Sequence, residues 1–136
     1  MDIKTAFKKY DPKSEAEWFE YNEMKFLIAP FGNTFQKKVI TEMFTLKEAI
    51  GLEENGALTF EDVKANVAIG RLYQLYSKSL VLDWEKVEEN EKPLAFSADK
   101  IHEWMMEHTE FANWVTSTSQ QLRKKLSTAK EELAKN

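Results

Sequence analysis

The segment 102–108 contains the chain's two histidines, one at each end, with Glu103 and Glu107 between them. A helical zinc site needs two histidines four residues apart, because only then do both imidazoles reach one ion. His102 and His108 are six residues apart, roughly 240° around a helix, and therefore lie on different faces. The chain has no cysteine, so a zinc site would need distant carboxylates. We interpret both histidines as surface residues and predict no metal site.

Pairs of adjacent carboxylates occur at Glu53-Glu54, Glu61-Asp62 and Glu88-Glu89. General acid–base catalysis needs carboxylates in a shielded pocket, where their pKa values are driven apart. These pairs fall in predicted loops or in the first turn of a predicted helix, where solvation or capping explains them. The sequence also lacks a glycine-bracketed serine and a glycine-rich phosphate loop. We therefore predict no catalytic residue and no cofactor, and expect that the protein is not an enzyme.

The basic run Arg123-Lys124-Lys125 is the segment best suited to contact phosphate groups. Acidic residues follow it within two turns, and no aromatic platform for stacking bases accompanies it. The formal charge of the whole chain is −4, which disfavours a polyanionic partner. We interpret the run as a solvated helix face and expect no nucleic-acid partner.

The composition is typical of one folded domain. Of the 136 residues, 43% are hydrophobic and 12% aromatic, so the chain can bury a core. Glycine and proline are too few for the tight turns of an all-β protein, and the lack of cysteine fits a reducing compartment. No apolar stretch approaches the roughly 18 residues of a membrane span, and the N-terminus lacks a signal-peptide core. We expect a single domain over 1–136 that stays in the cytoplasm, with no membrane partner.

Apolar residues alternate with polar ones in the segment 17–29, which follows a polar arm at 1–15. This alternation predicts a β-hairpin at about 17–29, with Asn22-Glu23 as its two-residue turn and Pro30 at its end. A two-stranded hairpin is marginally stable alone, so its apolar face must pack on helices.

Helical spacing of apolar residues predicts four to five helices, each beginning at a residue that can cap it. The predicted helices run from Thr34 to about Ile50, over about 60–83, from Ser97 to near His108, and from Thr109 onward. A charged loop separates the second helix from the third, and we expect Trp84 and Phe96 to hold the two halves together. The predicted fold class is mainly α, with four to five helices in one domain and a small antiparallel hairpin near the N-terminus.

The last predicted helix carries a narrow apolar stripe beyond about residue 120, flanked by basic and acidic side chains. So narrow a stripe buries little surface against its own domain, and residues 120–136 are expected to protrude or fray. Self-association or docking on a partner helix is one use for this stripe, and a frayed tail is the alternative. The candidate partner-binding residues are Leu122, Leu126, Leu133 and Trp114.

Several short motifs, in order over roughly residues 15–117, resemble a known family. The residues that carry this resemblance are Trp18, Ile28, Gly32, Asn33, Asp83, Trp84, Pro93, Leu94, Phe96, Phe111 and Val115. Together they are similar to the small tail assembly proteins of long-tailed bacteriophages and prophages. The chain departs from that pattern at Pro30 and Phe31, where relatives usually carry a basic residue. It also has Lys86 and Lys92 where glycine is common.

The resemblance implies a non-enzymatic tail assembly chaperone. Such a protein binds the tape measure protein, keeps its long hydrophobic helices soluble, and helps to recruit tail tube subunits. It acts in the host bacterial cytoplasm and is typically absent from the mature virion. The alternatives are a structural minor tail protein that stays in the virion and, from another class, a small DNA-binding regulator.

Overall fold

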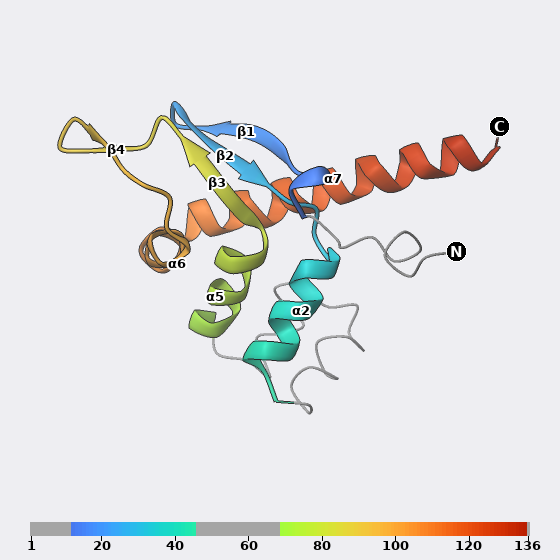
Figure 1. Ribbon diagram of the computed structural model, residues 1–136, viewed down its shortest axis with the longest axis horizontal. Coiled ribbons are helices and arrows are strands. Elements are labelled where there is room, and N and C mark those ends of the chain that lie inside the picture. Colours follow the sequence, from blue (N-terminus) through green and yellow to red (C-terminus); the bar gives the residue numbers. More distant parts are fainter. Residues whose placement is uncertain (1–11, 46–68, 136) are drawn as a thin grey trace, which may run out of the picture.

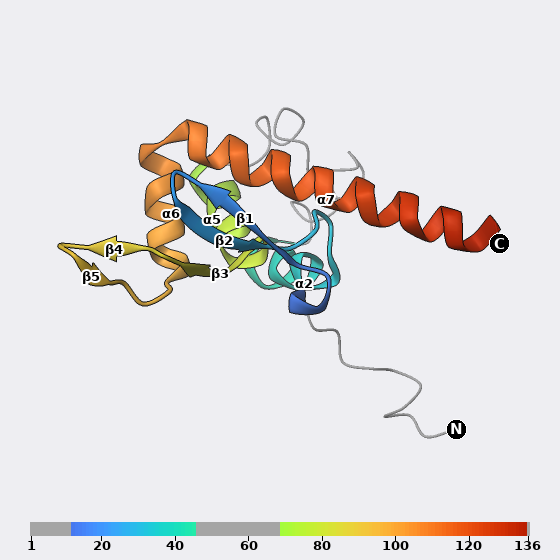
Figure 2. The same ribbon diagram turned by 90° about the horizontal axis from the view of Figure 1, so that it is seen from above.

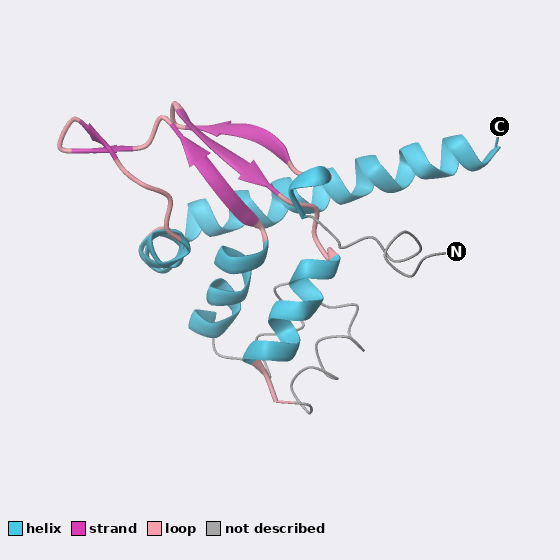
Figure 3. Cartoon of the chain, viewed as in Figure 1, coloured by secondary structure: helices cyan, strands magenta, loops and turns pink. Residues whose placement is uncertain are grey.

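The computed structural model describes residues 12–45 and 69–135. The elements in chain order are η1 (Pro12–Ser14), β1 (Glu17–Tyr21), β2 (Met24–Ile28), α2 (Thr34–Met43), α5 (Ile69–Ser79), β3 (Val81–Glu85), β4 (Glu88–Glu89), β5 (Lys92–Pro93), α6 (Ala98–Glu107) and α7 (Thr109–Lys135). Helices dominate, and a small antiparallel sheet lies beside them (Figure 1, Figure 3). The predicted mainly α fold class, with a hairpin near the N-terminus, is confirmed.

The predicted hairpin is formed by β1 and β2, which pair antiparallel from Glu17↔Ile28 to Tyr21↔Met24. Asn22 and Glu23 make its two-residue turn with φ of 47° and 68°, the left-handed values of a type I′ turn. One face of the sheet packs on the helices, and its residue Phe26 is fully buried there. The hairpin therefore gains its stability from the helices beneath it.

The sheet has a third strand, β3, which lies next to β2 in the order β1-β2-β3. The sequence placed these residues at the end of a helix over about 60–83, and that prediction is wrong: α5 ends at Ser79. Val81 and Trp84 instead lie in a strand whose register with β2 includes Phe26↔Trp84. The apolar residues of this segment are locally compatible with a helix or with a strand. Pairing with the free edge of β2 favours the strand.

The charged loop predicted between the two halves is a second, smaller hairpin of β4 and β5. Its turn residues Asn90 and Glu91 have φ of 53° and 65°, so it turns without glycine in the same way as the first hairpin. Figure 2 shows it projecting from the body, away from the C-terminal end of α7. Trp84 and Phe96 are in contact as predicted, with ring centroids 5.1 Å apart, and Trp84 Nε1 donates to Leu94 O at 2.7 Å.

The helix ends follow local capping chemistry, with two differences from the prediction. Asn33, not Thr34, is the N-cap of α2, because its Oδ1 accepts the Gln36 N–H at 2.7 Å. That helix ends at Met43, well before the predicted end near residue 50. Ser97 caps α6 as predicted.

The core lies between the sheet and the helices, with α5 at its centre. Leu75 and Tyr76 of α5 are fully buried, and the helix packs against α2 on one side and α6 on the other. Burial raises the pKa of the Tyr76 hydroxyl above its ordinary value, and the neighbouring Tyr73 raises it further. Tyr76 therefore stays neutral in the folded state.

Several predictions concern residues outside those described. They are the polar arm up to residue 11, the helix over 46–50, the first part of the helix at about 60–83, and the carboxylate pairs Glu53-Glu54 and Glu61-Asp62.

Candidate partner-binding surface

Residues 29–33 connect β2 to α2, and we call this segment the joint. Hydrogen bonds tie it to the middle of α7, about ninety residues later in the chain. Ser119 Oγ donates to Ala29 O at 2.6 Å, and the Phe31 N–H donates to Ser119 O at 3.2 Å. One turn further along, Arg123 donates to Phe31 O at 2.8 Å. These bonds fix the direction in which α7 leaves the body.

The conformation of the joint explains why glycine and asparagine stand at positions 32 and 33. Gly32 has φ of 75°, and a Cβ there would collide with the Arg123 guanidinium, so only glycine fits without movement. Asn33 Nδ2 donates to Pro30 O at 2.8 Å and to Ser79 O at 3.2 Å. At Gly32 and Asn33 the resemblance therefore rests on residues with a structural role, and neither residue carries a reactive side chain.

The other residues of the resemblance do not converge on one site. Trp18 lies on the outer face of the sheet and is 41% exposed, whereas Phe111 and Val115 are buried in the core. Trp84 of β3 and Phe96, which precedes α6, pack edge to face on each other.

The predicted partner-binding stripe changes character along α7. Leu122 is only 2% exposed, so its own domain already covers it. Leu126 is half-buried, and the side chain of Leu133 lies outside those described. Trp114 is half-buried and packs on Tyr21 with ring centroids 4.9 Å apart. Partner binding by these four residues stays a prediction, and Leu122 and Trp114 have a structural role in the domain.

The last part of α7 extends beyond the body of the protein (Figure 1, Figure 2). Its described side chains beyond Leu126 are exposed. The exposed Lys125 pairs with Glu17 of β1 at 3.3 Å, which is a weak surface contact. The helix α7 is continuous as far as Lys135.

The two histidines differ in their surroundings. His102 is half-buried, and its Nε2 lies 2.8 Å from Gly70 O. His108 is exposed at the C-cap of α6. Within residues 12–45 and 69–135, no group of three or more histidine, aspartate or glutamate side chains is placed to hold a metal ion.

A groove of about 380 Å³ opens at the corner where α6 meets α7, and we call it the corner groove. The turn of β1 and β2 and the link between β3 and β4 complete its walls. Val87 and Phe111 form its buried floor, each 4% exposed. Tyr21, Met24 and Trp104 form half-buried sides.

Ring contacts hold the sides of the corner groove in place. Trp104 stacks on Trp84 with centroids 5.1 Å apart, and Tyr21 meets the edge of Phe111 at 5.4 Å. The exposed carboxylates Glu88 and Glu110 lie at its rim, together with His108. The groove therefore combines an apolar interior with an acidic edge.

The corner groove was not predicted from the sequence, because its residues come from three segments far apart in the chain. The available signal in the sequence was the presence of four tryptophans in a chain of 136 residues.

In the part of the chain that is described, no helix has the length and apolar character needed to cross a membrane.

Comparisons with known proteins give one finding. The model of a family described as YdaY prophage protein matches residues 34–136, which is more than half of the chain. The match begins at the start of α2 and includes the corner formed by α6 and α7. A search of the curated proteins and a search of the solved structures return no match.

Proposed function

This chain belongs to the YdaY prophage protein family, and we propose that it is a non-enzymatic tail assembly chaperone. In this proposal it binds the tape measure protein of its prophage and assists assembly of the tail tube. The corner groove is the observation that carries the proposal, because it offers apolar aromatic surface to a partner. A half-exposed apolar hollow with a polar rim is typical of an interaction site.

The proposed mechanism is protection by binding, without catalysis or cofactor. In the family that the chain resembles, the chaperone keeps the long hydrophobic helices of the tape measure protein soluble. Apolar surface of the chaperone covers part of those helices, in the manner of a helix that lies in a groove. The acidic residues around the groove keep the complex soluble through charge repulsion.

Co-expression tests this function. The tape measure protein encoded in the same prophage is expressed alone and together with this chain, and its soluble fraction is measured. We expect a higher soluble fraction on co-expression, and recovery of both proteins when a tag on this chain is purified. Equal solubility with and without the chain, and no co-purification, would contradict the proposal.

We further propose that the protein acts in the host cytoplasm and is absent from the mature virion. Mass spectrometry of purified particles tests this part. Peptides of this chain at the abundance of tail proteins would instead favour the minor tail protein. A gel shift at about 0.1 M salt tests the DNA-binding alternative, and we expect no specific complex because the chain is acidic.

A further inference from the structure

We propose that the corner groove binds one large apolar side chain of a cationic amphipathic helix. This inference deepens the proposed function and rests on it only in naming the helix as part of the tape measure protein. The chemistry of the groove itself argues for the kind of helix that it takes.

The interior of the corner groove is apolar. Val87 and Phe111 close the floor, and the walls Tyr21 and Trp104 are held by ring contacts to the core. Rigid aromatic walls lose little conformational entropy on binding, which favours affinity. Met24 lines the same groove with a flexible thioether, and methionine adapts to partners of different shape.

The size of the corner groove suits a single anchoring side chain. The groove measures about 380 Å³, near the lower end of the roughly 300–1,000 Å³ of ligand pockets. That volume accepts one or two side chains and is small for a dinucleotide or a folded loop. One buried anchor, surrounded by weaker contacts, is the usual arrangement of a protein interface.

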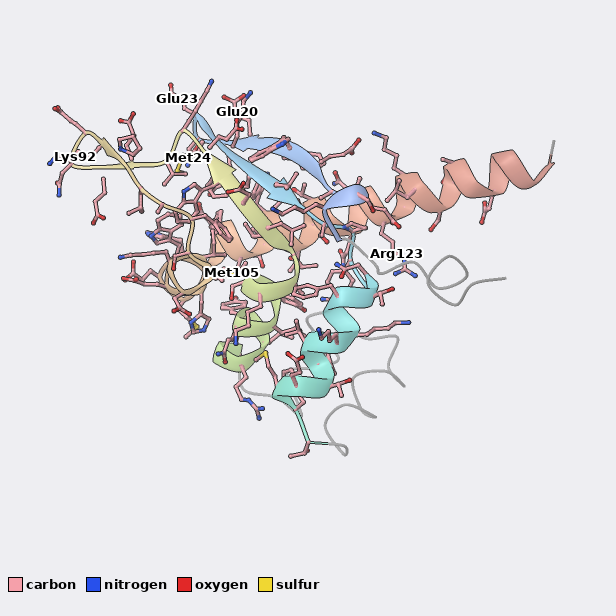
Figure 4. The ribbon with its side chains drawn as sticks, in the orientation of Figure 1. Glu20, Glu23, Met24, Lys92, Met105 and Arg123 are labelled. Carbon is pink, nitrogen blue, oxygen red and sulfur yellow. The ribbon has the colours of Figure 1, made fainter. Side chains whose placement is uncertain are left out.

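The charged residues that line the corner groove are acidic. Glu88 and Glu110 line the groove, and the described lysine and arginine side chains do not. Figure 4 shows Glu20 and Glu23 at the same end of the molecule as Met24, and Lys92 of the neighbouring hairpin is also at that end. None of these three charged residues lines the groove, so the charge of its rim rests on Glu88 and Glu110. A partner with basic residues beside its apolar anchor therefore complements the rim.

A second copy of the chain is a competing occupant, because its projecting α7 tail carries Arg123, Lys124 and Lys125. The two described leucines of that tail are already covered, however, because Leu122 is 2% exposed and Leu126 is half-buried beside the joint. Ala129 is exposed, but it is too small to serve as the anchor. The described part of the tail therefore offers no large exposed apolar side chain, and a separate client fits the groove better.

The test uses the full chain labelled with ¹⁵N and a synthetic amphipathic helix as the probe. The probe has about 18 residues, or five turns, with a central phenylalanine in a leucine stripe and lysines on its flanks. One matched peptide carries glutamate in place of lysine, and another carries alanine in place of the phenylalanine. We expect amide shifts at Asn22, Met24, Glu88 and Glu110, and binding at least tenfold weaker for both matched peptides.

Two charge-matched variants separate a specific site from general attraction. Glu88→Lys with Glu110→Lys alters the groove rim, whereas Glu42→Lys with Glu131→Lys makes the same charge change on exposed residues of α2 and α7. We expect about a tenfold loss of probe affinity for the first and less than about twofold for the second. Melting temperature and amide spectra confirm that both variants are folded.

Three results would overturn the inference. The first is a shift map centred on the joint or the tail. The second is equal loss of affinity in the two variants. The third is groove shifts that appear when the protein alone is concentrated, because a second copy would then be the occupant.

The same variants distinguish this inference from the proposed function. If the tape measure protein co-purifies equally well with wild type and with Glu88→Lys/Glu110→Lys, the groove assignment fails and the chaperone function stands. If the probe maps to the groove but wild type never binds the tape measure protein, the chaperone function fails and the groove assignment stands.

Discussion

The two halves of α7 carry the same apolar spacing but have different surroundings. In residues 109–122 the spacing brings Phe111, Val115 and Leu122 into the core, each at most 4% exposed. From Arg123 onward the described side chains are exposed, apart from the half-buried Leu126. The change occurs beside the joint, where Ser119 and Arg123 hold α7 against the rest of the chain.

This difference shows that an apolar stripe alone does not identify an interface. The stripe that was predicted to be exposed is partly core, and the apolar surface suited to a partner lies at the other end of the helix, in the corner groove. Four substitutions test how sharply the packed half of α7 differs from the projecting half.

The largest effect is expected from Phe111→Ala in the packed half. This ring touches Tyr21, Phe26 and Trp114, and its removal leaves a cavity in the aromatic cluster. We expect a loss of about 3–5 kcal/mol in the free energy of unfolding, measured by urea denaturation. A loss below about 1 kcal/mol would mean that this half of α7 is not part of the core.

Gly32→Ala at the joint should have the next largest effect, about 2 kcal/mol. The new methyl group meets a backbone with φ of 75° and collides with the Arg123 guanidinium. In a double-mutant cycle with Arg123→Ala, Gly32→Ala should cost less free energy of unfolding, because the guanidinium no longer collides with the new methyl group. The part of the cost that comes from the positive φ should remain. Strict additivity of the two substitutions would show that Arg123 does not lie over Gly32.

Ser119→Ala removes one hydrogen bond of the joint and should reduce the free energy of unfolding by about 1 kcal/mol. Its hydroxyl is buried and donates to Ala29 O at 2.6 Å. The exposed Ser127 on the next turns of the same helix provides the matched control, and Ser127→Ala should change the stability little. Equal effects of the two substitutions would remove the distinction between the halves.

The smallest effect is expected from Lys125→Ala in the projecting half. The substitution breaks an exposed pair with Glu17, and such pairs contribute at most about 1 kcal/mol. We expect a change within about 0.5 kcal/mol, which vanishes at high salt. A loss above about 2 kcal/mol would show that the projecting half is docked on the body.

The hairpin at about 17–29 and the cap at Ser97 were predictable because their signals are local. Alternation over a few residues sets the hairpin, and one hydroxyl at the right place starts α6. The strand β3 was not predictable in the same way, since Val81 and Trp84 continue the apolar stripe of the preceding helix. Pairing with β2, more than fifty residues earlier, decides their structure.

The candidate site was harder to predict than the fold. The corner groove forms where the turn at Asn22, the link at Val87 and the end of α6 at His108 lie close together. The spacing of residues in the sequence does not show that these three segments are neighbours in space. The C-terminal stripe was visible in the sequence, but the burial of Leu122 was not. In the sequence, only the motif at Gly32 and Asn33 indicated that the joint is conformationally constrained.

The most direct test of the central claim is the aggregation of the tape measure protein when it is diluted from denaturant. Light scattering is followed with increasing amounts of this chain, with an equal mass of serum albumin as the control and without nucleotide. We expect the scattering to fall as the chain is added and to reach a plateau at a fixed ratio of the two proteins. Scattering that matches the albumin control at every ratio would contradict the claim.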